Sequence, residues 1–215
     1  MTKNNPNILK ENIEFLIQTK QLEGSPSDYS KVDSLYKVSE KLELELTTLL
    51  TVNLAAKGKL DLSKIKFFIM DCDGVLTDGG MSFTESGDEI KRFNVKDGQG
   101  IKNIQGLGIL TGVISAGVNQ KIVKHRGKML GIEHVYIGKQ PKIEILDGWL
   151  KDLNLTMENV AYIGDDLKDL PILTKAGFSC CPADAVLEVR LAVDLVLSKN
   201  GGAGCVRELA DNYFG

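Results

Sequence analysis

The sequence predicts an α/β fold: a Rossmann-like, mostly parallel sheet with helices on both faces, a β-hairpin insertion and an N-terminal helical extension. Three observations lead to this prediction. After about residue 64, short apolar runs alternate with segments of helical periodicity, the pattern of a parallel sheet covered by helices. Two short runs of alternating apolar and polar residues around a glycine-containing turn predict the hairpin. The first 60 residues carry helical patterns only.

We therefore divide the chain into a helical N-terminal extension, residues 1–60, and a second domain, residues 61–215. Apolar residues recur at helical spacing over 8–17 and again, as one long amphipathic helix, over 32–49, with a turn signal at 24–28. Helices of this length need a packing partner. That partner is the second domain, the other helix or another subunit. A helical surface extension is the simpler interpretation, and partner binding or oligomerisation is the alternative.

The elements of the second domain follow from local composition and periodicity. Apolar runs rich in β-branched and aromatic residues predict strands, and apolar residues at every third or fourth position predict helices. We expect strands at 65–70, 109–115, 134–137, 160–164, 178–181 and 194–197, with a separate segment at 185–191. We expect the hairpin at 81–84 and 89–93, and helices at 98–107, 120–130, 142–153 and 169–175, with a last helix from near Gly204.

Two carboxylates follow the first strand. Asp71 and Asp73 are two positions apart, so they leave the strand on the same side and share one small space. Gly74 lets the chain turn sharply after them. Carboxylates this close need a cation or a shared proton, and Mg²⁺ suits oxygen ligands of this kind. A strand followed by an ordinary polar turn is the plainer interpretation of this motif taken alone.

A second strand end carries further acidic residues, because Val160–Ile163 runs into Gly164 and Asp165. Ligands of open α/β sheets bind outside the carboxyl ends of the strands. Ser115 ends a third strand, and Lys142 lies near the start of a helix. Taken in chain order, these groups fit one site. The first carboxylates supply a nucleophile, the hydroxyl a hydrogen bond to phosphate, the lysine a counter-charge to phosphate, and the last carboxylates complete a metal site.

Composition indicates a globular enzyme without a nucleic-acid or membrane partner. The 215 residues carry a net charge of −3 and contain no run of 18 apolar residues. The first residues lack an apolar secretory core, so we expect a cytoplasmic protein. Its four cysteines, Cys72, Cys180, Cys181 and Cys205, show no metal-binding spacing and are expected to be free thiols.

From about residue 64 onward, the chain resembles the haloacid dehalogenase superfamily of phosphatases. Four motifs match in order: DCDGVLTDG, a strand-end serine, a lysine and GDDLKD. The stretches KRFNVKDGQGI, AYIGDDLKDLP and NGGAGCVRE resemble its small capless members, which hydrolyse phosphorylated 2-keto-3-deoxy sugar acids. The resemblance implies a Mg²⁺-dependent phosphatase of sugar-acid and lipopolysaccharide biosynthesis. The implied substrate is 3-deoxy-D-manno-octulosonate 8-phosphate or a nine-carbon relative.

The resemblance also implies a role for each motif residue. Asp71 would attack phosphorus to form an aspartyl-phosphate, and Asp73 would act as general acid and then as general base. Mg²⁺ would be held by Asp71, Asp165 and the backbone carbonyl of Asp73. Ser115 would donate a hydrogen bond to phosphate, and Lys142 would supply positive charge.

The second motif departs from the family pattern. Members usually read Thr-Gly followed by Arg or Glu, whereas this chain reads Ser115-Ala116-Gly117-Val118. Gly117 or Val118 therefore stands where a charge would face the sugar acid. The candidates that would replace this charge are the cations Lys96, Arg126, Arg207 and Arg92. Arg207 follows a glycine-rich stretch at 201–204, and a helix starting there would offer backbone N–H groups to an anion.

Three alternatives to this function remain open. Similar domains occur as non-catalytic assembly or regulatory modules of sugar-acid activation, although such a module does not need the buried charges of Asp71, Asp73, Lys142 and Asp165. A phosphomutase usually carries a cap domain, for which this chain has no room. A phosphatase of another small sugar phosphate is the third.

Because the capless site is shallow, we expect a homotetramer in which a neighbour's hairpin covers each site.

Overall fold

The computed structural model describes residues 8–117 and 120–215. The chain forms two compact units, with the boundary between Leu60 and Asp61. Within the described residues, no helix is long and apolar enough to cross a membrane. All four cysteines are buried free thiols, in line with the prediction from their spacing.

The first unit is a small helical bundle with a core of its own. Its elements are α1 (Ile8–Gln18), a 3₁₀ turn (Pro26–Tyr29), α2 (Val32–Leu42), α3 (Leu46–Thr51) and α4 (Leu54–Lys59). Six apolar side chains from these elements and their loops are buried against one another: Ile13, Leu16, Leu22, Leu35, Val38 and Leu49. The helices of this unit therefore pack on each other, one of the three possibilities that their sequence left open.

The long helix predicted over 32–49 is wrong, because the chain breaks it at Glu43. This residue adopts a left-handed conformation with a φ of 53°, which ends α2. The hydroxyl of Ser39 donates to the carbonyl of Leu44 and holds the turn. The change of direction brings Leu49 of α3 into the core beside α1. Apolar spacing continues through the turn, so the sequence pattern does not show the break.

The second unit is built on a six-stranded parallel sheet with the order β5–β4–β1–β6–β7–β8. Its strands are β1 (Phe67–Met70), β4 (Leu110–Ser115), β5 (His134–Ile137), β6 (Val160–Ile163), β7 (Phe178–Cys181) and β8 (Leu195–Val196). From β1 the chain first moves to β4 and β5, and then returns to β6 on the other side of β1. The order reverses beside β1, the place where open α/β sheets form a ligand crevice.

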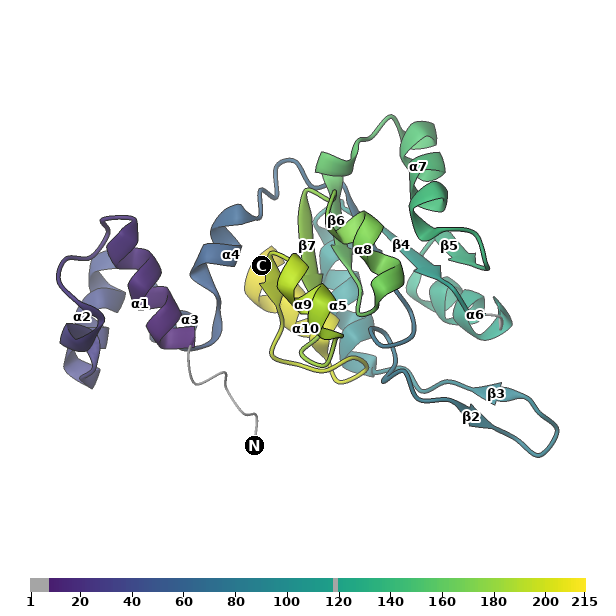
Figure 1. Cartoon of the computed structure of the whole chain (residues 1–215), viewed down its shortest axis with the longest axis horizontal. Coiled ribbons are helices and arrows are strands. Elements are labelled where there is room, and N and C mark those ends of the chain that lie inside the picture. Colours follow the sequence, from purple (N-terminus) through teal and green to yellow (C-terminus); the bar gives the residue numbers. More distant parts are fainter. Residues whose placement is uncertain (1–7, 118–119) are drawn as a thin grey trace. The chain divides into compact units, whose positions relative to one another are not determined.

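Helices cover both faces of this sheet, which confirms the predicted fold class. α7 (Lys142–Leu153) and α8 (Leu170–Leu173) share one core cluster with Phe67 and Ile69 of β1. α5 (Val95–Gly106) packs against α10 (Cys205–Leu209), and the terminal turn after α10 (Ala210–Phe214) places Phe214 against Phe68. Alternate residues of β1 thus enter opposite cores. Figure 1 shows these layers, with α6 (Gln120–Leu130) beside β5 and α9 (Leu187–Ala192) near α8.

Most predicted boundaries hold to within three residues, and α6 and α7 occupy the predicted ranges. α5 begins at Val95, three residues early, because the Asn94 side chain accepts from the N–H of Lys96 and caps the helix. The helix predicted over 169–175 is present but shorter, as α8, and a 3₁₀ turn (Leu167–Asp169) precedes it. The hairpin strands are short, β2 (Ser82–Phe83) and β3 (Glu89–Ile90), and Figure 1 shows the hairpin extending away from the sheet.

Candidate active site

The sheet brings the two acidic strand ends together. β1 and β6 are parallel neighbours in a register that pairs Met70 with Ile163. The N–H of Asp71 donates to the carbonyl of Ile163 at 3.0 Å, so the residues after both strands emerge at one edge. β4 lies on the other side of β1 and ends in the buried Ser115 at that same edge.

Asp71 and Lys142 form a buried ion pair at this edge. One oxygen of Asp71, Oδ1, accepts from the N–H of Cys72 at 2.6 Å, and Oδ2 lies 2.8 Å from Nζ of Lys142. Nζ also lies 2.7 Å from Oδ1 of Asp169. Burial alone would lower the pKa of Lys142, but the charges of Asp71 and Asp169 outweigh it and raise that pKa. The lysine therefore stays protonated between two carboxylates.

The carboxylate of Asp169 is fully buried and uses both oxygens to organise its neighbours. Oδ1 accepts from Lys142 and, at 2.6 Å, from the hydroxyl of Tyr162. Oδ2 accepts from the N–H groups of Asp165 and Asp166 at 3.1 and 3.2 Å. Asp169 thus fixes both the lysine and the loop that carries Asp165. Because each of its oxygens already accepts two hydrogen bonds, Asp169 is a poor metal ligand.

Asp165 differs from Asp169, because its buried Oδ1 has no hydrogen-bond partner. Carboxylate oxygens of Asp71, Asp165 and Asp169 lie within 4.8 Å of one another. Burial and the neighbouring charges of Asp71 and Asp169 raise the pKa of Asp165 to about 8. Burial, partly offset by Lys142, raises the pKa of Asp71 to about 7. A buried acceptor without a donor, in a cluster with more negative than positive charge, fits a hard cation such as Mg²⁺.

Gly74 is required where the loop after β1 passes Asp165. Its φ of +86° lies in the left-handed region, and a Cβ at this position would overlap the carboxylate of Asp165. Only glycine satisfies both conditions. The glycine read from the sequence as a turn residue thus also permits the two acidic loops to approach each other.

Asp73, the second carboxylate after β1, contacts the hairpin. Its Oδ1 lies 2.5 Å from Nζ of Lys91, the residue that directly follows β3, and 3.3 Å from the hydroxyl of Thr77. A Cβ built on Gly117 would lie 3.5 Å from Oδ2 of Asp73 and 3.3 Å from Oγ of Ser115. The structure therefore brings Asp73, Ser115 and Gly117 together, while Val118 lies outside the described residues.

The other three predicted substrate-binding residues are not part of this group. Lys96 is exposed on α5. Arg126 of α6 stacks over the ring of Phe93 at 5.7 Å and lines a separate cavity of about 650 Å³. Arg207 pairs through Nε with Asp211 of its own helical segment, at 2.7 Å. The cavity lined by Arg126 also includes Lys91, the partner of Asp73.

The helix that begins after Gly204 does not offer its N-terminus to an external anion. The buried carboxylate of Asp97, in α5, accepts from the N–H groups of Gly204, Val206 and Arg207 at 2.9 to 3.1 Å. The expectation of an anion site there is wrong, because a side chain of the same chain already provides the anion. Asp97 is an acidic cap that fastens α10 to α5.

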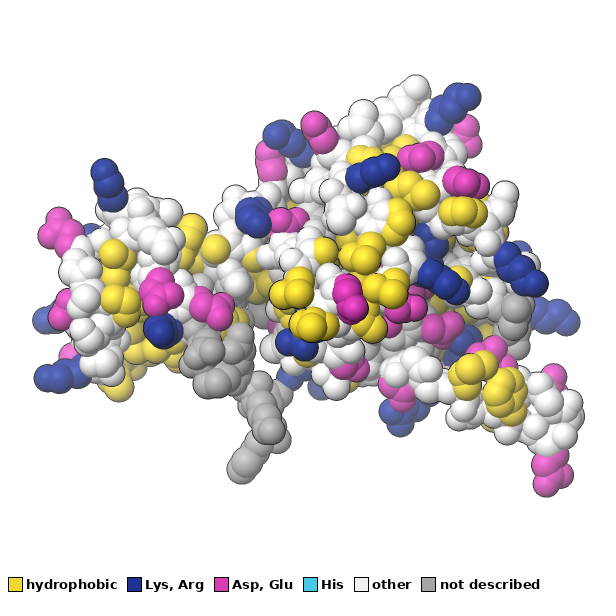
Figure 2. Space-filling model, in the orientation of Figure 1, with side chains coloured by type: hydrophobic (Ala, Val, Ile, Leu, Met, Phe, Trp, Pro, Cys, Tyr) yellow, Lys and Arg dark blue, Asp and Glu magenta, His cyan; other side chains and the backbone are white. Residues whose placement is uncertain are grey.

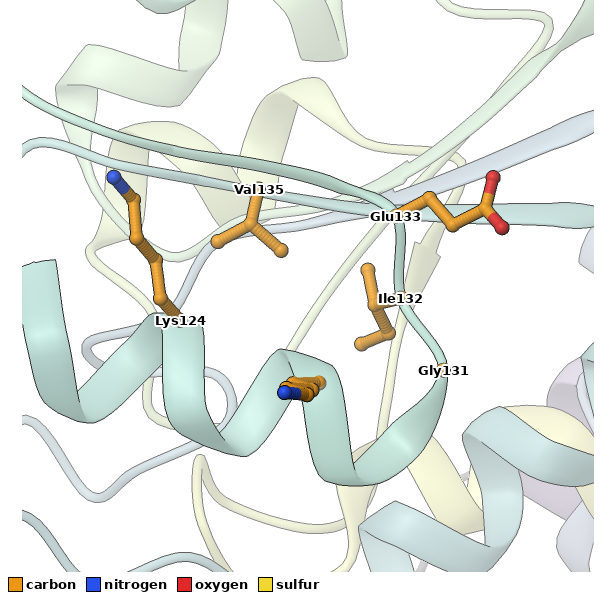
Figure 3. A pocket seen from close by; sticks show the side chains of 6 residues that line it. Lys124, Gly131, Ile132, Glu133 and Val135 are labelled. Carbon is orange, nitrogen blue, oxygen red and sulfur yellow. The ribbon is translucent and has the colours of Figure 1, made fainter.

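A further surface pocket of about 410 Å³ lies at the opposite edge of the sheet. Figure 3 shows its lining, which comes from α6 and the turn that leads into β5: Lys124, Lys128, Gly131, Ile132, Glu133 and Val135. These residues precede or begin β5, whereas the carboxylates follow the carboxyl ends of β1 and β6. This pocket is therefore separate from the candidate active site.

Two residues of the site, Lys91 and Tyr162, were not predicted from the sequence, and the role of a third, Asp169, was left open. Lys91 lies 18 residues beyond Asp73, and only the folding of the hairpin joins them. Tyr162 reads as a core residue of β6, and nothing in the sequence shows that its hydroxyl reaches Asp169. For Asp169 the sequence left three roles open: holding a metal-bound water, orienting Lys142 or capping a helix. The structure shows the contact with Lys142 and the cap spacing after Asp166.

Comparison with known proteins gives consistent matches. A family model described as haloacid dehalogenase-like hydrolase matches residues 114–209. The 3-deoxy-D-manno-octulosonate 8-phosphate phosphatase of Haemophilus influenzae is 43% identical over 150 residues, 70% of this chain and 83% of that protein. The enzyme of the same name from Escherichia coli K12 is 41% identical over 147 residues, 68% of this chain and 78% of that protein.

Solved structures agree with these sequence matches. The 3-deoxy-D-manno-octulosonate 8-phosphate phosphatase of Moraxella catarrhalis, solved with magnesium, phosphate and the sugar acid KDO, is 37% identical with a TM-score of 0.67. That match covers 72% of this chain and 87% of the solved one. A probable phosphatase from Pseudomonas syringae is 42% identical with a TM-score of 0.69, over 75% of this chain and 89% of the solved one.

Proposed function

The chain belongs to the haloacid dehalogenase-like hydrolases, in the family of the 3-deoxy-D-manno-octulosonate 8-phosphate phosphatases, and we propose that it hydrolyses this phosphorylated sugar acid or a nine-carbon relative. Its enzyme class is phosphoric monoester hydrolase. The observation that carries the proposal is the site at the carboxyl ends of β1 and β6. There a buried Asp71–Lys142 pair lies beside Asp165, whose buried oxygen has no hydrogen-bond donor.

The proposed reaction proceeds in two steps. A carboxylate oxygen of Asp71 attacks phosphorus, the bond from phosphorus to the sugar oxygen breaks, and Asp73 gives that oxygen a proton. Water then attacks phosphorus while Asp73 takes its proton, and the bond from phosphorus to the Asp71 oxygen breaks, which releases inorganic phosphate and the free Asp71 carboxylate. The position of Asp73 beside Ser115 and Gly117 supports this assignment, because its Oδ2 faces the same space as the serine hydroxyl.

The charges around the nucleophile support phosphoryl transfer. Lys142 is buried and paired with Asp71, so its positive charge stays at the attacking group. Asp71, Asp165 and the backbone carbonyl of Asp73 would hold Mg²⁺, which supplies charge neutralisation of the phosphoryl oxygens when bound. Such transfers depend mainly on positioning and on neutralisation of charge. The Asp169 contacts to Lys142 and to the Asp165 loop provide that positioning.

A basic cavity beside the site supports an acidic sugar as substrate. Lys91, Lys121, His125 and Arg126 contribute to its lining, and Lys91 also contacts Asp73. We assign the carboxylate of the sugar acid to this cavity, with Arg126 as its counter-charge. Gly117 has no charged side chain, so Arg126 would supply the positive charge that the second motif lacks.

Phosphate release tests this function. With Mg²⁺, purified protein should release phosphate from 3-deoxy-D-manno-octulosonate 8-phosphate or its nine-carbon relative in preference to neutral sugar phosphates. Asp71→Asn should lower turnover by more than about 1,000-fold while the circular dichroism spectrum and Tm stay close to wild type. Phosphate release by Asp71→Asn at near wild-type rates would rule out Asp71 as the nucleophile.

The buried charges of Asp71 and Lys142 argue against the alternative function, a non-catalytic module, because such a module does not need them.

We also propose that the active form is a homo-oligomer, a tetramer, in which a neighbour's hairpin covers each site. The hairpin exposes Met81, Phe83 and Ile90 by 68, 57 and 54%, an apolar surface that association would bury. Replacing 82–90 with a short glycine-containing turn should raise KM for the sugar acid phosphate far more than KM for 4-nitrophenyl phosphate. Sedimentation that shows a fully active monomer would refute the shared site.

A further inference from the structure

We propose that Lys91 is a positioning residue: it anchors one oxygen of the Asp73 carboxylate so that the other oxygen faces the phosphate-binding space. The inference rests on the proposed function, because it gives Asp73 the role of acid and base. It adds a residue from the hairpin to a site whose other charged groups follow β1 and β6 or begin α7.

The environment of Lys91 differs from that of an ordinary surface lysine. Its side chain is only 6% exposed, although a lysine is seldom buried unless it is paired. Nζ lies 2.5 Å from Oδ1 of Asp73 and 2.8 Å from Oε1 of Glu89, whose side chain is 9% exposed. Burial lowers the pKa of Lys91, but hydrogen bonds to these two carboxylates outweigh it and raise that pKa. The ammonium group is therefore charged and held from two sides.

The two oxygens of Asp73 have different surroundings. Oδ1 lies within hydrogen-bonding distance of Lys91 and of the Thr77 hydroxyl. Oδ2 accepts no hydrogen bond from the described residues, and it lies beside Gly117 and Ser115. With Oδ1 held by Lys91, Asp73 presents Oδ2 in a fixed direction, and Oδ2 is the oxygen that carries the proton in the acid form. Proton transfer to the leaving oxygen needs that arrangement, because the acid must come within hydrogen-bonding reach.

Loss of Lys91 would leave the Asp73 and Glu89 carboxylates close together without a cation between them. Like charges at this separation repel, and the Asp73 side chain, 36% exposed, is free to turn toward water. A misplaced acid matters most for a sugar leaving group, whose alkoxide is a strong base and needs a proton as it departs. It matters little for 4-nitrophenolate, which leaves without one.

The test measures release of the leaving group in a single turnover, with enzyme in excess, because this reports only the first chemical step. Lys91→Met, Lys91→Arg and the surface control Lys102→Met are compared on the sugar acid phosphate and on 4-nitrophenyl phosphate. We expect Lys91→Met to slow the saturated rate for the sugar substrate by about 100-fold and for the aryl substrate by less than about 5-fold. Lys91→Arg should recover most of the loss, and Lys102→Met should match wild type.

Two kinetic outcomes would overturn the proposal. If Lys91→Met weakens only the affinity for the sugar acid phosphate, Lys91 is a substrate ligand. If both substrates lose rate equally, the variant has damaged the whole site. Should Lys91→Met not fold, Lys91→Gln carries the same comparison.

A second measurement does not depend on activity. Hydrogen exchange of the β3 amides should rise in Asp73→Asn and in Lys91→Met, with no further increase in the double variant, because both changes break the same contact. Additive increases would overturn the proposal. If wild-type protein releases neither leaving group, the proposed function fails, and the exchange cycle alone decides whether Lys91 anchors Asp73.

Discussion

Asp165 has a buried oxygen without a hydrogen-bond donor, and the pKa values of Asp71 and Asp165 are both raised. These two features have one physical origin. Several carboxylates are removed from water in a cluster where Lys142 is the positive group. A divalent cation would reverse both effects, because it supplies charge and fills the open coordination position. Protons and the metal therefore compete for these carboxylates.

The metal requirement should depend on pH. The folded pKa values, about 7 for Asp71 and about 8 for Asp165, exceed the ordinary value of 3.8, so the metal-free folded state binds more protons than the unfolded state. Stability of the metal-free protein should fall as pH rises through 7 and 8, and the stabilisation by Mg²⁺ should grow. Calorimetry should show a larger Mg²⁺-induced rise in Tm at pH 8.5 than at pH 6. An equal rise at both values, or an unchanged pH dependence in Asp165→Asn, would contradict this linkage.

Gly74 offers a test of the close approach between the two acidic loops. Gly74→Ala adds a Cβ that overlaps the Asp165 carboxylate, so the loops must separate and the metal site must open. We expect Mg²⁺-dependent turnover to fall by more than about 100-fold. Gly79→Ala is the matched control: its φ is also positive, at +74°, but the nearest atoms to its Cβ are 3.6 Å away. It should cost about 1 kcal/mol of stability and little activity. Equal losses of activity in both variants would show that backbone strain, not the clash, is responsible.

The sequence predicts the charged cluster well and its surroundings poorly, for a physical reason. Asp71, Asp165 and Ser115 come together because parallel strands end at one edge, and strand ends are visible as apolar runs that stop at polar residues. Lys91 reaches Asp73 only after the hairpin folds back, and no local pattern encodes that contact. For Arg207, substrate binding stays a prediction, and its Nε pairs with Asp211 four residues later.

At the scale of elements, the Asp97 carboxylate replaces the side-chain cap that α10 lacks. Gly204 occupies the N-cap position of α10 and has no side chain to accept from the first N–H groups. Asp97, 2% exposed, accepts from three of them across about 107 residues of sequence. Burial raises the pKa of the Asp97 carboxyl, and the three backbone hydrogen bonds offset part of this effect because they favour its charged form. The contact joins α5 to α10 on the face of the sheet opposite α7.

Removing this cap should destabilise the second unit without changing the chemistry. Asp97→Ala leaves three N–H groups without an acceptor, two of them buried and that of Arg207 partly buried. We expect a loss of about 2 to 3 kcal/mol in the free energy of unfolding. Asp97→Asn keeps one acceptor oxygen and should lose less. Asp211→Asn, which breaks only the half-exposed pair with Arg207, should change stability by less than about 1 kcal/mol. Denaturant unfolding measures all three, and equal losses for Asp97→Ala and Asp211→Asn would contradict the capping role.

Element boundaries follow the sequence where a local signal ends the element. α7 ends at Leu153 because Asn154 takes the left-handed conformation, a common helix stop. Glu43 takes the same conformation between α2 and α3, but glutamate carries no such signal. The break is instead favoured by tertiary packing of Leu49, which no single-helix pattern reveals. Helices are therefore predictable up to the point where the packing of another element decides their ends.

At the scale of the whole chain, each of the two units is stabilised by its own interior. The first unit buries Asn12 at 1% exposure inside its core. The side-chain amide donates to the carbonyls of Leu49 and Val52 at 3.0 and 2.7 Å, and its oxygen accepts from the N–H of Leu54 at 2.9 Å. One side chain thus joins α1 to the end of α3 and to the start of α4. The second unit carries all the acidic groups of the candidate site. It also exposes apolar side chains in α9 and in the 3₁₀ turn before α8, and Figure 2 shows apolar surface in this region.

These separate interiors predict two thermal transitions that respond to different changes. Asn12→Ala removes three buried hydrogen bonds and should lower the free energy of unfolding of the first unit by about 2 to 3 kcal/mol, with unchanged phosphate release. Thr51→Ala removes an exposed hydrogen bond within α3 and should cost less than about 0.5 kcal/mol. Mg²⁺ should raise only the transition of the second unit, since ligands stabilise the fold that binds them. Calorimetry of the full chain distinguishes the cases: if Asn12→Ala and Mg²⁺ shift one common transition, the two units unfold as a single cooperative body.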